Sequence, residues 1–126
     1  MPRHAFGVAV EQADMDAAVA LLAEDVVFRS PAVFKPYERR ETVATILRTV
    51  FEVLEDFRYT DELDGEDIHA LLFDARVGDR SLQGIDLLRP NPEGQIAELT
   101  VMIRPASGLI AVAERMGPAL EAAGVR

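Results

Sequence analysis

Asp86 is the first candidate for chemistry, because it is a carboxylate inside a predicted strand, where aspartate is disfavoured. It belongs to the segment LQGIDLLRPNPEGQIAELTVMIR (82–104), which predicts two strands joined by a turn at 91–94. Burial among apolar side chains raises the pKa of an aspartate, so that it can donate a hydrogen bond or act as a base near neutral pH. The alternative is a structural aspartate bonded to nearby hydroxyl or backbone donors.

Three further side chains are candidates for the same site. His69 shares the predicted inward side of its strand and would form an acid/base couple with Asp86, although a lone strand histidine is more often half-buried and structural. Tyr37 and Tyr59 are candidate ligand-binding hydroxyls; the alternative is packing at a rim with the hydroxyl in water.

The two faces of the hairpin differ in their predicted roles. A four-residue turn at 91–94 would place Asp86 opposite Leu99 and Arg89 opposite Ile96. The face shared with Asp86 then carries Leu82, Gly84, Leu88, Ala97, Leu99, Val101 and Ile103. We predict that Leu88, Leu99, Val101 and Ile103 line a ligand pocket.

The other face of the hairpin is also apolar. It carries Ile85, Leu87, Arg89, Ile96, Glu98, Thr100, Met102 and Arg104. Because so large an apolar surface is unfavourable in water, we predict a homodimer through this outer face of the sheet.

Composition limits the classes of function. The 126 residues predict one domain over 1–126, and a net charge of -9 is typical of a soluble surface that does not bind nucleic acid, since phosphate contacts need clustered basic residues. With no cysteine, only two histidines and no glycine-rich phosphate loop, we predict neither a metal nor a cofactor. No segment has the pattern of a signal peptide or a membrane span, so we expect a cytoplasmic protein without membrane contact.

The hydrophobic periodicities alternate between helical and strand-like. They predict a helix over 8–23, a short strand in DVVFRSP, a loop that includes Tyr37, a helix over 40–56, strands over 57–63 and 69–77, and a tight turn at Gly78 and Asp79. A last helix is predicted over 106–116, where Gly117 and Pro118 either end it or bend it ahead of a short helical tail. Helices on one face of a curved antiparallel sheet, an α+β fold, would satisfy this order.

These segments also carry a family resemblance over nearly the whole chain. The leading helix, DVVFRSP, RRETVATILRTVF and GIDLLRPNPEGQIAELTVMIRP, in that order, resemble the SnoaL-like branch of the nuclear transport factor 2-like superfamily. The resemblance implies a cystatin-like α+β barrel: a conical half-barrel of mostly antiparallel sheet, with helices on its concave face around a small-molecule cavity and often a dimer through the convex face. The superfamily includes ketosteroid isomerases, polyketide cyclases and limonene epoxide hydrolases, so the fold does not determine the reaction.

The resemblance to ketosteroid isomerases is partial. IDLLRPNPEG matches their strand aspartate, hydrophobic pair, arginine and glycine turn, which places Asp86 at the position of their protonated oxyanion-hole acid. Their general base precedes a proline, where this chain has Ser30, and their oxyanion tyrosine would fall near Phe6 or be absent.

Three functions therefore remain open. The leading expectation is a cavity protein that binds a small, largely apolar molecule and acts on it by acid/base chemistry through Asp86. The alternatives are a non-catalytic carrier or ligand sensor, and a dimerising module whose cavity is filled by side chains.

Overall fold

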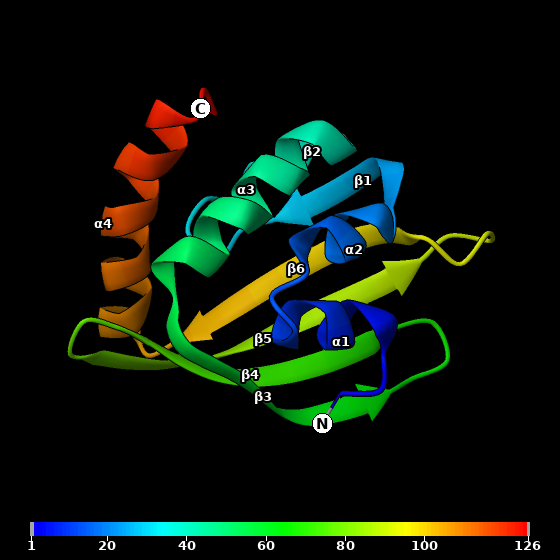
Figure 1. Cartoon of the computed structure of the whole chain (residues 1–126), viewed down its shortest axis with the longest axis horizontal. Coiled ribbons are helices and arrows are strands. Elements are labelled where there is room, and N and C mark those ends of the chain that lie inside the picture. The colour runs from blue at the N-terminus through cyan, green and yellow to red at the C-terminus, as the bar shows by residue number, and fades with distance from the viewer. Residues whose placement is uncertain (1, 126) are drawn as a thin grey trace.

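The computed structural model describes residues 2–125, which form a six-stranded sheet with helices on one of its faces (Figure 1). The elements in chain order are α1 (Ala5–Glu11), α2 (Met15–Ala20), β1 (Leu22–Arg29), β2 (Tyr37–Glu38), α3 (Arg40–Val53), β3 (Glu55–Asp64), β4 (His69–Val77), β5 (Arg80–Pro90), β6 (Ile96–Arg104) and α4 (Ala106–Ala122). The strand order is β2-β1-β6-β5-β4-β3, with β1 parallel to β6 and the other neighbours antiparallel.

The core lies between the sheet and the helices, as the α+β prediction requires. Helix α3 directs Val43, Ile46 and Leu47 into it, at the three- and four-residue spacing that places side chains on one helical face. The described residues contain no helix that has both the length and the apolarity needed to cross a membrane. The predicted mostly antiparallel sheet with helices on one face is confirmed.

The single leading helix predicted over 8–23 is wrong. Two short helices, α1 and α2, replace it, and Ala13 between them has a positive φ of 57° that no helix interior accommodates. The Asp14 side chain accepts a hydrogen bond from the backbone N–H of Ala17 at 3.1 Å, so it caps a new helix. Apolar periodicity continues across this break, which explains why the pattern alone predicted one helix.

The observed register of the hairpin differs from the predicted one by two residues. Asp86 lies opposite Val101 rather than Leu99, and Arg89 opposite Glu98 rather than Ile96. The loop contains five residues, 91–95, with Gly94 at a φ of 82°, and an irregularity between Arg89 and Pro90 adds a second displacement. Two one-residue displacements leave Asp86 on its predicted face, because side chains alternate with a period of two.

The same irregularity changes the face of Ile96. This residue pairs with Leu22 of β1 and is 4% exposed, so it belongs to the core and not to the predicted outer face. Other boundaries also differ from the prediction. β1 begins at Leu22, α3 ends at Val53, and Tyr37 begins a short strand beside β1 instead of lying in a loop. Of the two outcomes predicted at Gly117 and Pro118, α4 does not end there but continues to Ala122.

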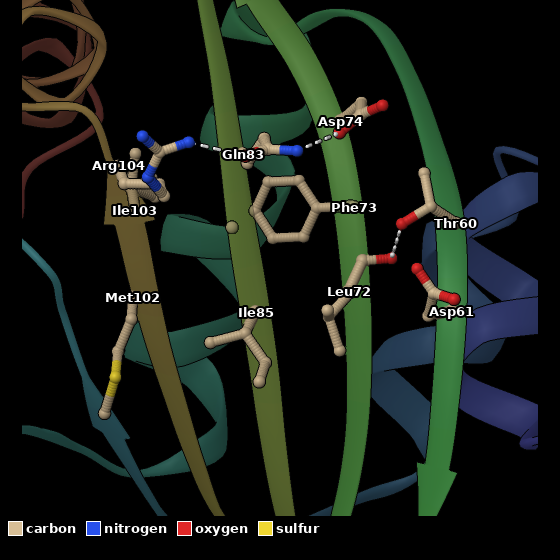
Figure 2. A pocket seen from close by; sticks show the side chains of 11 residues that line it. Thr60, Asp61, Leu72, Phe73, Asp74, Gln83, Ile85, Met102, Ile103 and Arg104 are labelled. Atoms are coloured by element: carbon tan, nitrogen blue, oxygen red, sulfur yellow. Dashed lines mark hydrogen bonds between the residues drawn. The ribbon is translucent and has the colours of Figure 1, made fainter.

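The face of the sheet away from the helices carries a shallow depression of about 340 Å³, the outer hollow (Figure 2). Its lining is Thr60, Asp61, Leu72, Phe73, Asp74, Gln83, Gly84, Ile85, Met102, Ile103 and Arg104. Gln83 links three strands here, because its side chain accepts from Arg104 at 2.6 Å and donates to Asp74 at 3.4 Å. The exposed Met102 and the half-buried Ile85 keep part of this face apolar.

Candidate functional site

A second cavity, the inner cavity, lies between the sheet and the helices and has a volume of about 310 Å³. Its lining is Phe28, Ser30, Pro31, Ala32, Val33, Tyr37, Ile46, Leu47, Val50, Leu54, Phe73, Asp86, Val101, Ile103, Leu109, Val112, Ala113, Met116, Gly117 and Leu120. Asp86 is the one charged side chain in this lining among the described residues. The volume is near the lower end of the range of about 300 to 1,000 Å³ that is usual for small-molecule sites.

Asp86 reaches the inner cavity from the middle of β5. The side chain is 5% exposed, and its Oδ2 accepts a hydrogen bond from the hydroxyl of Tyr59 at 2.8 Å. Burial raises the pKa of Asp86 from 3.8 to about 7, because the charged form loses its hydration, and the Tyr59 hydrogen bond offsets part of that rise. Asp86 is therefore present in both protonation states near neutral pH.

The two carboxyl oxygens of Asp86 have different surroundings. Oδ2 accepts from Tyr59, whereas Oδ1 has no hydrogen-bond partner within the described residues. Because every fully buried side-chain oxygen or nitrogen of those residues has a partner, Oδ1 is not fully buried. Since Asp86 lines the inner cavity, Oδ1 is the oxygen that a bound molecule can reach. A neutral Asp86 can donate a hydrogen bond there, and an ionised Asp86 can accept a proton.

Tyr59 lies on β3, two strands away from β5 in the sheet, and its hydroxyl group reaches Asp86 across β4. Burial raises the pKa of Tyr59 well above 10.0, and the carboxyl group of Asp86 adds to the effect. The phenol therefore remains protonated and acts as a donor to Asp86 at all ordinary pH values.

The predicted pocket residues divide into two groups. Tyr37, Val101 and Ile103 line the inner cavity, and Tyr59 reaches it through its hydrogen bond to Asp86. Leu88 and Leu99 do not line it, contrary to the prediction, although they point to the same side of the sheet. They face each other across β5 and β6 and are each 1% exposed, so they belong to the solid core beside the cavity.

The acid/base hypothesis required His69 to pair with Asp86, and it does not. Its Nε2 lies 2.5 Å from Glu62 and its Nδ1 3.2 Å from Asp64, and its ring packs against that of His4 with 4.6 Å between centroids. The residue opposite Asp86 on β4 is Leu71, two positions farther along the strand. His69 thus joins the start of the chain to β3 and β4, and it does not line the inner cavity.

Sequence reasoning missed most of the helical wall and gave Ser30 no role in the site. Ser30 lines the inner cavity just beyond β1, and its Oγ accepts from the backbone N–H of Ala32 at 3.0 Å. The hydroxyl hydrogen of Ser30 has no acceptor within the described residues, so it can be donated to a ligand. Helices α3 and α4 supply apolar lining that periodicity identified only as core-facing.

The described residues contain no group of three or more His, Cys, Asp or Glu side chains arranged to hold a metal ion. Among the described residues that line the inner cavity, the side chains with a carboxyl or hydroxyl group are Asp86, Ser30 and Tyr37. Carboxyl and hydroxyl groups can bind a carbonyl or hydroxyl group and transfer a proton.

Two solved structures are similar to this chain in both sequence and fold. A crystal structure described as a steroid delta-isomerase from Pseudomonas aeruginosa is 38% identical, with a TM-score of 0.87 over 98% of this chain and 97% of that chain. An uncharacterised protein with a cystatin-like fold from Silicibacter pomeroyi is 32% identical, with a TM-score of 0.88 over 93% of this chain and 83% of that chain.

A more distant structure shows the fold alone. An NTF2-like protein of unknown function from Cytophaga hutchinsonii has 19% identity and a TM-score of 0.64 over 82% of this chain and 87% of that chain. No curated protein matches the chain. The model of the SnoaL-like domain matches residues 3–112, and the chain therefore belongs to the SnoaL-like family, within the nuclear transport factor 2-like fold.

Proposed function

We propose that this protein binds a small, largely apolar carbonyl compound in the inner cavity and moves a proton on it through Asp86. The observation that carries the proposal is the buried carboxyl group of Asp86 at the wall of an apolar cavity, with a hydrogen bond to only one of its two oxygens. An apolar wall with few polar groups selects an apolar body with one polar function.

The proton transfer would use both states of Asp86. In a β,γ-unsaturated ketone, ionised Asp86 removes a proton from the carbon between the carbonyl group and the C=C bond, and the electron pair of the broken C–H bond moves through the carbonyl group to its oxygen as a dienolate. Protonated Oδ1 then delivers the proton to the γ-carbon. The carbonyl group re-forms and the C=C bond has moved into conjugation with it, so nothing is consumed. Ser30 and Tyr37 are the hydroxyl donors in the cavity lining that can stabilise the enolate oxygen.

Two facts support isomerisation over other acid/base reactions. The pKa of Asp86, about 7, suits a group that must both accept and release a proton near neutral pH. The 38% identical Pseudomonas aeruginosa protein is described as a steroid delta-isomerase. Ser30 occupies the position at which ketosteroid isomerases carry their base, so Asp86 would have to do both transfers here.

The test is the conversion of cyclohex-3-enone to the conjugated cyclohex-2-enone, followed by ultraviolet absorbance. The wild-type protein should accelerate it, and Asp86→Asn should reduce the rate to that of buffer. Asp79→Asn is the matched control, because Asp79 lies in the β4–β5 turn with a side chain that is 96% exposed. A wild-type rate equal to that of Asp86→Asn would refute the catalytic role.

A non-catalytic ligand carrier is the second candidate. It is favoured by one observation, that no other carboxylate or histidine in the described residues lines the inner cavity to share the proton transfer. In that case cyclohexanone should bind in an Asp86-dependent way, as measured by NMR line broadening, while cyclohex-3-enone is not converted.

We also propose a homodimer through the outer face of the sheet. The proposal is supported by the largely apolar set of side chains that this face leaves exposed or half-buried: Met102, Ile85, Leu87 and Thr100. Ile96 does not belong to this face, because it lies in the core. Light scattering at micromolar concentration should give twice the mass of the chain, and Met102→Lys should shift the protein toward the monomer. A wild-type monomer at that concentration would refute this assembly.

A further inference from the structure

We propose that Tyr59 is the positioning residue of this site: it holds Oδ2 of Asp86 and thereby leaves Oδ1 as the oxygen that meets the ligand. The inference deepens the proposed function, because it assigns which oxygen acts and what controls its protonation.

The hydrogen-bond inventory of the pair determines where the proton lies. Tyr59 has one hydroxyl hydrogen, and its acceptor is Oδ2 of Asp86 at 2.8 Å in a buried setting. Because Oδ2 already accepts this bond, the proton of a neutral Asp86 belongs on Oδ1, where it points to the inner cavity. A neutral Asp86 therefore presents a donor to the ligand, and an ionised Asp86 presents an acceptor at the same point.

The ring of Tyr59 is held by aromatic neighbours. It meets Phe57 edge to face, with 4.9 Å between ring centroids and an interplanar angle of 89°, and Phe73 in the same way at 6.3 Å and 86°. Edge-to-face contacts of this kind are favourable and orient the ring. Phe73 also lines the inner cavity, so the aromatic cluster that fixes Tyr59 is part of the cavity wall.

The backbone of Tyr59 is held as well. Its N–H donates to Oε2 of Glu11 in α1 at 2.9 Å, and the pairing of β3 with β4 is irregular between Tyr59 and Asp61. β3 is at the edge of the sheet, where N–H groups lack a strand partner. A carboxylate from the first helix thus supports the strand segment that directs the phenol to Asp86.

No other charged group competes for Asp86 at the cavity. Tyr59 faces it from β3, and Tyr37 on β2 lines the same cavity, whereas the lining from β1, β4, β6, α3 and α4 contains no charged side chain in the described residues. Glu11 is directed to the backbone of Tyr59 and not to Asp86. Among the polar side chains that contact Asp86 or line the cavity with it, the Tyr59 hydroxyl is therefore the one whose loss should change the protonation of Asp86 most.

The test is the titration of Asp86 by carbon-13 NMR in the ligand-free protein with Tyr59→Phe. Loss of a hydrogen bond to the charged form should raise the titration midpoint by about one pH unit or more. Tyr37→Phe is the matched control, since it removes the phenol that lines the cavity and makes no hydrogen bond to Asp86, and it should leave the midpoint unchanged. A Tyr59→Phe midpoint at or below the wild-type value, or an equal shift in Tyr37→Phe, would overturn the proposal.

A second measurement needs only the wild-type protein. The Cζ resonance of Tyr59 should change with the same midpoint as Asp86, because its hydroxyl donates to that carboxyl group, and the Cζ resonance of Tyr37 should not. A pH-independent Tyr59 resonance across the Asp86 transition would also overturn the proposal. Neither measurement uses a ligand, so an inactive protein in the enone assay would refute the proposed reaction and leave this inference standing.

Discussion

Replacing Asp86 with Asn should remove a pH-dependent part of the free energy of unfolding. Asn can keep the hydrogen bond from Tyr59 through its amide oxygen and does not ionise. The pKa of Asp86 is raised from 3.8 to about 7 by burial, so the folded protein holds a proton that the unfolded chain releases. The stability that this proton contributes is fully present below about pH 3.8 and is lost as the pH rises through 7.

The magnitude follows from linkage. Between pH 5 and pH 8 the wild type should lose about 2 to 3 kcal/mol of this contribution, while Asp86→Asn should lose none of it. Asp86→Asn should therefore gain stability relative to the wild type by that amount as the pH rises over this interval.

Urea unfolding of both proteins at several pH values would measure this difference, because all other titrating groups are shared and cancel. Asp79→Asn, at an exposed turn, should show no pH-dependent difference from the wild type. A difference between wild type and Asp86→Asn that stays constant within about 0.5 kcal/mol from pH 5 to pH 8 would refute the buried, neutral carboxyl group.

Three further predictions concern packing and the start of the chain. Leu99→Ala should cost about 2 to 5 kcal/mol in urea unfolding, because Leu99 is 1% exposed, whereas Leu63→Ala, at a 62% exposed position, should change stability by less than about 0.5; equal effects would contradict the burial. Gly84→Ala should cost about 1 to 3 kcal/mol by the same assay, since its Cβ would lie 2.1 Å from Cζ of Phe73, and an unchanged denaturation midpoint would show that the ring moves freely. Burial and the neighbouring His69 lower the pKa of His4 below 6.5, so the contribution of His4 to stability is present above pH 6.5 and is lost as the pH falls below that value. His4→Asn keeps an N-cap acceptor and should remove this part of the acid sensitivity when urea unfolding is measured at several pH values. Equal acid sensitivity of the wild type and His4→Asn would contradict the lowered pKa.

The alternation of side chains along the hairpin was sufficient to predict that Asp86 faces the core. Its register could not be predicted, because it depends on a five-residue loop and on the irregularity at Arg89 and Pro90. Because side chains alternate with a period of two, an error of two residues in the register leaves Asp86 on its predicted face. Ile96 lies between the two one-residue displacements, so its register differs by one residue and its side chain points to the other face. The broken first helix has the same origin, since a single residue with positive φ, Ala13, leaves little trace in an apolar pattern.

The partners of Asp86 depend on tertiary structure alone. Tyr59 is 27 residues away in sequence and on a strand that does not neighbour β5, so its hydrogen bond requires the order β5-β4-β3 and the inward direction of both side chains. His69 points to the same side and was the partner expected from sequence, yet its place at the first residue of β4 directs it to Glu62 and Asp64. Local periodicity predicts which way a side chain points, but only the packing of distant strands and helices decides which groups meet, and this is why the carboxyl group was found in the sequence and its phenol partner only in the fold.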